Sequence, residues 1–180
     1  ALTRNRAHAI VYALGGGTCG AALVRIAAGH HDIELTSGIA LLGGDDFDAQ
    51  LCAMALERAG LAFPSEPALR YDLLRACRAA EEAMPPNIKR IVVELSALGD
   101  AAPDAPVVIP VAEYYERVRP LVEDTLSALE PVLAALRDEE QVGGDLAGIY
   151  MVGGATGLPV VARILKERFG RRVHRSPNPA

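Results

Sequence analysis

The residues of this chain best suited to chemistry are four in a row, Gly15, Gly16, Gly17 and Thr18, which follow an apolar run at residues 10–14. Glycine has no Cβ, so it accepts positive φ and lets backbone N–H groups come close to an anion. The Thr18 hydroxyl can donate to a phosphate or face a metal-bound water. The pattern predicts either a phosphate-binding turn between two strands or a simple hairpin turn, and by itself it does not separate them.

A second glycine turn lies near the end of the chain. An apolar run at residues 149–152 leads into Gly153 and Gly154, and a helical pattern over residues 158–169 closes at Gly170. A strand, a glycine turn and a helix start can bind an anion or a nucleotide, because N–H groups and the helix dipole point at the turn. The alternative is a turn whose glycines only allow tight packing, and the local pattern favours neither.

Hydrophobic periodicity predicts the elements around these turns. We expect a meander of strands at residues 7–14, 21–27 and 32–37, joined at its second turn by a surface loop with His30 and His31. Helices follow at residues 45–59, with Asp45 as N-cap, and at 67–84. Short strands are predicted at 91–95 and 107–109. A long apolar stripe over residues 111–136, which includes Tyr115, is interrupted by Pro120 and Pro131, so we expect kinks or a second helix beginning near Glu130.

Three motifs, in order, resemble the second lobe of the nucleotide-binding domain of the seventy-kilodalton heat-shock chaperone (DnaK) family. They are Val-Tyr-Ala-Leu-Gly-Gly-Gly-Thr at residues 11–18, Leu-Gly-Gly-Asp-Asp-Phe-Asp at 42–48 and Met-Val-Gly-Gly-Ala-Thr-Gly-Leu-Pro at 151–159. Asn178-Pro179 matches the start of the family's Asn-Pro-Asp-Glu-Ala. The resemblance covers essentially the whole chain. It implies an α/β fold, the actin-like ATPase (ribonuclease-H-like) lobe, with a mixed sheet and flanking helices.

The resemblance also implies a domain organisation and a site. Residues 1–60 and 111–180 would form the core lobe, and residues 61–110 an inserted subdomain with a helix and a strand pair. Gly15–Thr18 would meet the β- and γ-phosphates, and the loop from Gly153 would flank the adenosine. The implied nucleotide-binding residues are Gly15, Gly16, Gly17, Thr18, Gly153, Gly154, Ala155 and Gly157.

The family binds nucleotide between two lobes, and the first lobe's phosphate loop, catalytic lysine and acidic residue do not occur in these 180 residues. Neither does the peptide-binding domain. The resemblance therefore implies ATP or ADP with magnesium in a full-length protein, and no tight nucleotide binding by this fragment. The implied partners are the first lobe and the peptide-binding domain of the parent chain, with co-chaperones or client proteins.

The sequence departs from the family where side chains would hold magnesium. Ala13 stands at the aspartate that precedes the family's Leu-Gly-Gly-Gly-Thr, and Gly20 stands at the aspartate two places after the threonine. Ile39 replaces a third aspartate. Neither alanine nor glycine supplies a charge or an acceptor for the metal's waters. We therefore expect no catalytic residue and no metal ligand in this chain.

The residues at the positions where the family contacts the adenine base also differ from the family's. A gapless alignment of residues 76–85 puts Arg78 at the family's glutamate, Glu81 and Glu82 at its lysine and arginine, and Pro85 at its serine. Gly157 replaces the arginine that stacks on adenine, Ala155 replaces a serine, and Ala180 an aspartate. Phosphoryl transfer depends on positioning and electrostatic stabilisation, so we expect little or no ATP hydrolysis.

Two alternatives remain. The fold could survive as a pseudo-ATPase scaffold for protein–protein interaction, or the chain could be related to sugar or acetate kinases, although the second and third motifs oppose the kinase reading. The net charge is −5 with dispersed basic residues, which argues against nucleic acid. No apolar run approaches the roughly 20 residues that span a bilayer. Cys19, Cys52 and Cys77 lack metal spacing, which indicates reduced residues of a cytoplasmic protein.

Overall fold

The structure, a computed structural model, describes residues 6–27, 30–85, 87–140 and 145–175. The predicted match at Asn178-Pro179, together with Ala180, lies outside the described residues. The chain divides into two compact units, one of Ala1–Gly44 with Val122–Ala180 and one of Asp45–Leu121. The assignment of residues 61–110 as an inserted subdomain stays a prediction.

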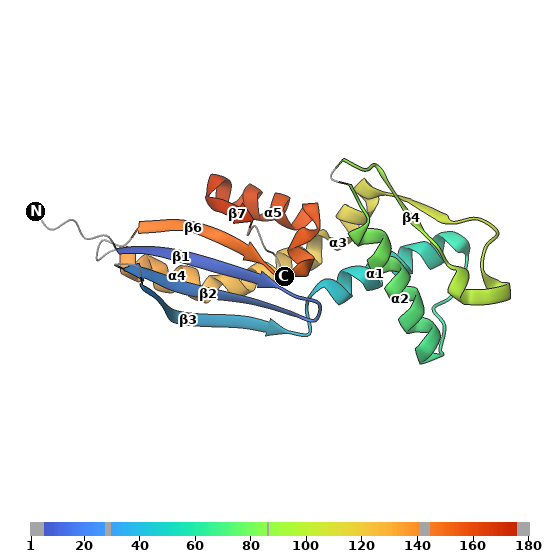
Figure 1. The fold of residues 1–180 in the computed structure, drawn as a ribbon, viewed down its shortest axis with the longest axis horizontal. Coiled ribbons are helices and arrows are strands. Elements are labelled where there is room, and N and C mark those ends of the chain that lie inside the picture. The colour runs from blue at the N-terminus through green and yellow to red at the C-terminus, as the bar shows by residue number, and fades with distance from the viewer. Residues whose placement is uncertain (1–5, 28–29, 86, 141–144, 176–180) are drawn as a thin grey trace, which may run out of the picture. The chain divides into compact units, whose positions relative to one another are not determined.

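The first unit is built on a five-stranded sheet in the order β3-β2-β1-β6-β7 (Figure 1). Three strands, β1 (Arg6–Leu14), β2 (Thr18–Ala27) and β3 (His30–Ala40), form the predicted antiparallel meander. Two more, β6 (Asp145–Val152) and β7 (Val173–Arg175), extend the sheet beyond β1 in parallel. His30 and His31, predicted to lie in a turn, instead begin β3 with exposed side chains, because strand pairing with β2 extends to both residues.

Helices cover this sheet and supply the rest of its core. Helix α4 (Leu129–Glu140) packs against β1, β2 and β3, and α5 (Pro159–Phe169) contacts β7. Ile10, Tyr12 and Leu14 occupy every second position of β1, so their side chains lie on one face of the sheet, and all three are completely buried. Short 3₁₀ helices η3 (Gly154–Gly157) and η4 (Gly170–Arg172) flank α5. The mixed sheet with flanking helices confirms the predicted α/β class.

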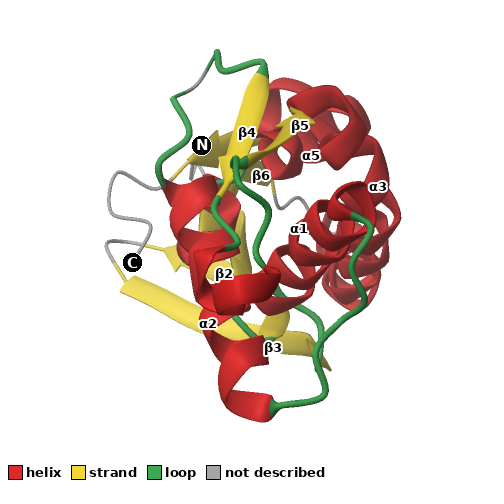
Figure 2. Cartoon of the chain, turned by 90° about the vertical axis from the view of Figure 1, so that its right-hand side faces the viewer, coloured by secondary structure: helices red, strands yellow, loops and turns green. Residues whose placement is uncertain are grey.

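The second unit is mainly helical (Figure 2). It contains α1 (Gly44–Ala59) from Asp45 onward, α2 (Pro67–Glu82) and most of α3 (Val111–Thr125). A two-stranded antiparallel sheet, β4 (Arg90–Val93) and β5 (Val107–Pro110), brackets the 3₁₀ helix η1 (Ser96–Ala101). The aromatic residue that α3 buries in this unit is Tyr114, which has no exposed surface, rather than the predicted Tyr115.

The long helical pattern is divided into two helices, and the second begins at Leu129, as predicted near Glu130. Helix α3 continues through Pro120, and the 3₁₀ helix η2 (Leu126–Ala128) separates it from α4. Pro131 falls in the first turn of α4, where a missing N–H costs no helical hydrogen bond. Within the described ranges, no helix is long and apolar enough to cross a membrane.

Candidate functional site

The first glycine turn joins β1 to β2 and presents its backbone to solvent. The N–H of Gly15 donates to the carbonyl of Thr18 over 2.9 Å, which closes the turn. Gly16, Gly17 and Thr18 are all exposed. The turn therefore offers accessible backbone groups at the end of a buried strand, as an anion-binding turn requires.

A second pair of glycines packs directly on this turn. The N–H of Gly44 donates to the carbonyl of Gly15 over 2.9 Å. A Cβ added to Gly43 would lie 2.4 Å from the carbonyl oxygen of Gly16, and one added to Gly44 would lie 3.0 Å from the Cβ of Ala155. Neither glycine was among the predicted site residues. The signal that could have found them is a Gly-Gly pair between a strand and a helix start.

The third glycine segment follows β6. Gly153 has φ of 93°, and a Cβ at this position would lie 2.4 Å from the carbonyl oxygen of Leu14, so only glycine fits. The buried Thr156 donates to the Gly153 carbonyl from its hydroxyl, at 2.7 Å, and from its N–H, at 3.1 Å. Gly154 and Gly157 are exposed, and an added Cβ would meet no atom within 4 Å at either position.

The sheet places these turns at one edge. Ala13 pairs with Val152 in the parallel β1–β6 register, so the segments that begin at Gly15 and Gly153 leave adjacent strands in the same direction (Figure 1). The eight predicted nucleotide-binding residues therefore lie in two neighbouring loops, with Gly43 and Gly44 packed on the first. Ligands of α/β proteins bind outside the carboxyl ends of strands, which suits this edge. That these residues bind nucleotide stays a prediction.

A buried polar cluster supports the strands behind the first turn. The hydroxyls of Tyr12 and Thr125 lie 2.5 Å apart, and the Thr125 hydroxyl donates to the carbonyl of Val122. Tyr12 is therefore the donor of the pair. The thiol of Cys19, next to Thr18, donates to the Thr125 carbonyl over 3.7 Å. Burial raises the pKa of Cys19, which makes it a structural thiol rather than a nucleophile.

Two of the three positions where the family's aspartates are missing, Ala13 and Gly20, face each other. Ala13 and Gly20 are direct partners in the antiparallel β1–β2 register, next to the glycine turn that separates them. Side chains of paired residues on adjacent strands lie on the same face of a sheet. Carboxylates at both positions would point into the same space, and the chain supplies neither. The two glycine loops, which we call the cradle, therefore suit a phosphate group through their backbone N–H groups. At Ala13 and Gly20 the cradle has no acidic side chain that could hold a divalent cation.

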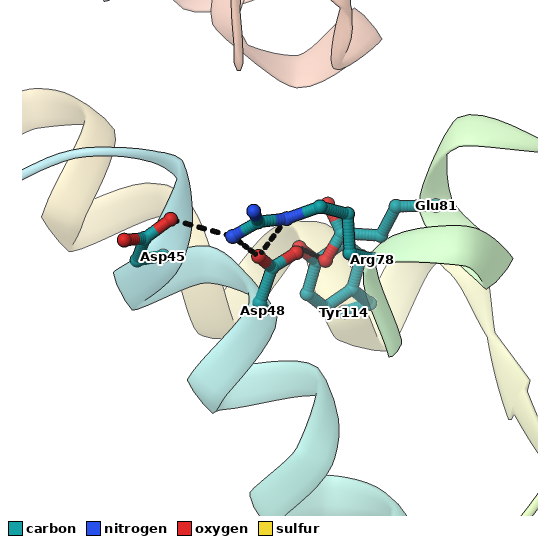
Figure 3. A network of polar contacts seen from close by, with 5 residues as sticks. All are labelled: Asp45, Asp48, Arg78, Glu81 and Tyr114. Atoms are coloured by element: carbon teal, nitrogen blue, oxygen red, sulfur yellow. Dashed lines mark hydrogen bonds and ion pairs between the residues drawn. The ribbon is translucent and has the colours of Figure 1, made fainter. Parts of the chain in front are cut away.

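Residues 76–85, which align with the family's helix on the base side, lie in the second unit, and two of them, Arg78 and Glu81, belong to an internal polar network (Figure 3). Arg78 donates from Nε to the Asp48 carboxylate over 2.8 Å, and its Nη2 contacts Asp48 and Asp45. Asp48 is only 4% exposed, and burial raises its pKa although Arg78 opposes the shift. Asp45, predicted to be the α1 N-cap, instead lies in the helix's first turn and binds Arg78.

Glu81 is engaged in the same network. The Tyr114 hydroxyl donates to Oε1 of Glu81 over 2.5 Å (Figure 3). Burial is the main reason that the pKa of Glu81 rises to about 8. Glu82 and Pro85, the other residues at these aligned positions, are exposed. Within the described ranges, no cluster of three or more His, Cys, Asp or Glu side chains could hold a metal ion.

A mixed sheet with flanking helices, and with glycine loops at the carboxyl ends of two central strands, is the architecture of an actin-like ATPase lobe. Comparison with known families agrees, since the family described as Hsp70 protein matches residues 2–180. This chain belongs to the Hsp70 protein family, and its fold is the actin-like ATPase fold, as the motifs predicted.

Curated relatives are chaperones of this family. A chaperone protein HscA homolog from Chromobacterium violaceum is 35% identical over 162 residues, which cover 90% of this chain and 25% of the relative. The HscA homologs from Bordetella petrii and Polynucleobacter asymbioticus are 38% and 37% identical, over 89% and 94% of this chain. The chain spans about a quarter of the length of these relatives.

Proposed function

We propose that this chain is the second lobe of the nucleotide-binding domain of a divergent Hsp70-type chaperone, and that its nucleotide site is degenerate. In the full-length protein, ATP or ADP would lie between this lobe and a first lobe. The fragment alone would bind nucleotide weakly and would not hydrolyse it. Family membership supports the first statement, and the side chains at the site support the second.

The observation that carries the proposal is the contrast between backbone and side chains at one edge of the sheet. Gly43 and Gly153 each occupy positions where a Cβ would come within 2.4 Å of a carbonyl oxygen, so the cradle depends on glycine. Ala13 and Gly20, in contrast, remove the paired carboxylates that would order a metal's waters. The glycines that shape the loops are therefore retained, whereas the carboxylates that would bind the metal's waters are absent.

The expected loss of activity is large. A well-placed charged group at a reacting centre contributes roughly 2–4 kcal/mol to the barrier, so losing two would slow hydrolysis by several orders of magnitude. Magnesium, if bound, would neutralise phosphate charge, and this lobe's described residues at Ala13 and Gly20 offer no side chain to position it.

Steady-state phosphate release by the full-length protein tests the proposal, with an active Hsp70 chaperone as reference. We expect turnover far below the reference. Turnover equal to the reference would refute the degenerate site. Titration of the 180-residue chain with magnesium-ATP by calorimetry tests the second part, where we expect no tight binding.

A protein-binding scaffold is the second candidate, and the absence of carboxylates at Ala13 and Gly20 favours it. A two-lobed protein that gives neither heat nor a thermal shift with ATP or ADP would select the scaffold over a nucleotide-sensing lobe. In either case the partners that we propose are a first lobe, a peptide-binding domain, co-chaperones and clients, in the cytoplasm.

A further inference from the structure

The second loop of the cradle lies next to the end of β7. In the parallel β6–β7 register Met151 pairs with Arg175, the last residue of β7, so both strands end at the same edge of the sheet. The loop Gly153–Gly157, which follows β6, contains no charged residue, and neither does Gly15–Thr18. The sheet therefore brings an arginine from elsewhere in the chain to an uncharged loop.

One contact fixes where the Arg175 side chain lies. Its Nη2 donates to the carbonyl oxygen of Gly157 over 3.4 Å, between residues that are 18 positions apart in the chain. This bond uses a single N–H of the guanidinium, and Arg175 is exposed, so its other donors and its planar face stay open to solvent. Within the described ranges, no carboxylate forms an ion pair with Arg175. Its charge is therefore available to a ligand.

The loop leaves space for a planar group beside this arginine. Gly154 and Gly157 are exposed, and a Cβ added at either position would meet no atom within 4 Å. A guanidinium is a flat, delocalised cation that stacks on aromatic rings. The loop therefore offers an aromatic ring open backbone to lie on and a guanidinium to stack with.

The position of Arg175 along the loop favours a base over a phosphate as its ligand. Gly153, the first residue of the loop, packs on Leu14 beside the first glycine turn, whereas Arg175 contacts the last residue, Gly157. The family resemblance leads us to expect an arginine at position 157, where this chain has glycine. Arg175 returns a guanidinium to that end of the loop from a different strand.

We propose that Arg175 stacks on the base of a bound nucleotide. This assignment rests on the proposed function, because it places the phosphates of the nucleotide at Gly15–Thr18. The site then still recognises a base, although Ala13 and Gly20 leave it without carboxylates for a metal. A lobe of this kind senses nucleotide without hydrolysing it, which distinguishes it from a scaffold that has lost nucleotide binding.

An NMR titration of the 180-residue chain tests the proposal, with ADP, adenosine and tripolyphosphate as probes at millimolar concentration. ADP and adenosine should move the side-chain proton resonances of Arg175 upfield, because the ring current of an aromatic ring shields protons above its face. Tripolyphosphate has no ring and should cause no upfield shift. The amides of Gly16 and Gly17 report separately on the phosphates, so ADP and tripolyphosphate should both shift them.

Matched variants separate stacking from charge. Arg175→Gln should raise the Kd for ADP about three- to fivefold, as expected for loss of a cation from an exposed aromatic ring, and should leave the Kd for tripolyphosphate unchanged. Arg175→Lys keeps the charge without the planar face and should restore only part of the affinity. Arg172→Gln removes an equal charge from an exposed arginine whose backbone lies beside Gly148, in the first half of β6, and should have no effect.

The outcomes distinguish this proposal from the proposed function. If ADP shifts Gly16 and Gly17 but Arg175→Gln binds it as tightly as the wild type, only the role of Arg175 is overturned. An equal loss of tripolyphosphate affinity, or full recovery by lysine, would also overturn that role, since charge alone would then account for it. If ADP shifts neither loop, the proposed nucleotide site is refuted as well. Should a variant fail to fold, the ring-current shift in the wild type decides.

Discussion

Gly43 lies so close to Gly16 that a single added carbon at Gly43 would come within 2.4 Å of the Gly16 carbonyl oxygen. The obstacle is backbone, which cannot rotate away as a long side chain can. We therefore expect Gly43→Ala to displace the first glycine turn and to lower the free energy of unfolding by about 1–3 kcal/mol, a usual cost of overpacking. Urea denaturation of the 180-residue chain measures this cost.

Gly154→Ala is the control for this effect. It adds the same methyl group to an exposed glycine of the same edge, where an added Cβ meets no atom within 4 Å. Its free energy of unfolding should change by no more than about 0.5 kcal/mol. Equal costs for the two substitutions would contradict the close packing of Gly43 on the turn.

Restoring two carboxylates tests why the site should be inactive. The double variant Ala13→Asp/Gly20→Asp places acidic side chains on directly paired residues of β1 and β2. In the full-length protein we expect it to bind magnesium-nucleotide more tightly than the parent and to release phosphate faster. The control is Ala22→Asp/Val11→Asp, an equally paired but more distant position on the same two strands. Equal gains from both pairs would mean that added charge alone, and not its placement, is responsible.

The pair formed by Arg78 and Asp48 should be important for stability. Arg78→Gln leaves Asp48, which is 4% exposed, without its cation. Losing one partner of a fully buried ion pair costs roughly 3–5 kcal/mol, and we expect about 2 kcal/mol because the Arg78 side chain is 49% exposed. Urea denaturation should show that Asp48→Asn restores part of this loss in the double variant. Arg75→Gln, an exposed arginine of the same helix, should have little effect.

Glu81 should make stability depend on pH. Burial raises its pKa from the ordinary value of a glutamate, near 4.5, to about 8 in the folded chain, so the folded state binds the proton more tightly. The stabilisation is fully present below pH 4.5 and is lost as pH rises through 8, with a total on the order of a few kcal/mol. In urea denaturation, the stability of the wild type relative to Glu81→Gln should fall over this window. A constant difference from pH 5 to pH 9 would show that Glu81 ionises normally.

The backbone of Leu41 is strained because a residue with a Cβ adopts a positive φ there. It has φ of 60°, in the left-handed region, and its side chain is 90% exposed, so packing does not compensate. Leu41→Asn should raise the free energy of unfolding by about 0.5–1 kcal/mol, because asparagine tolerates this conformation better. Leu41→Ala keeps the Cβ and should give no such gain. The same urea titration distinguishes them, and a gain from alanine would point to the exposed leucine surface instead.

Much of the fold could be predicted from local patterns. Strand β1, the glycine turn and the helix closed by Gly170 follow from apolar runs and glycine positions, which act over a few residues. The sequence predicted a second helix beginning near Glu130, and α4 begins at Leu129, directly after the break at Leu126–Ala128. Pro131 lies in the first turn of α4, where its missing N–H costs no helical hydrogen bond, whereas Pro120 lies inside α3 and forgoes one without ending the helix.

By itself, the sequence determined where glycines stand in the chain and which of the family's carboxylates are missing, because both depend on residue type alone. Only the tertiary structure decided that Ala13 faces Gly20, that Gly43 packs on Gly16, and that Arg78 and Glu81 bind Asp48 and Tyr114. Those pairs are separated along the chain, and their contacts depend on strand register and on the packing of helices. A local pattern of charge or hydrophobicity does not predict which distant residue a side chain will contact.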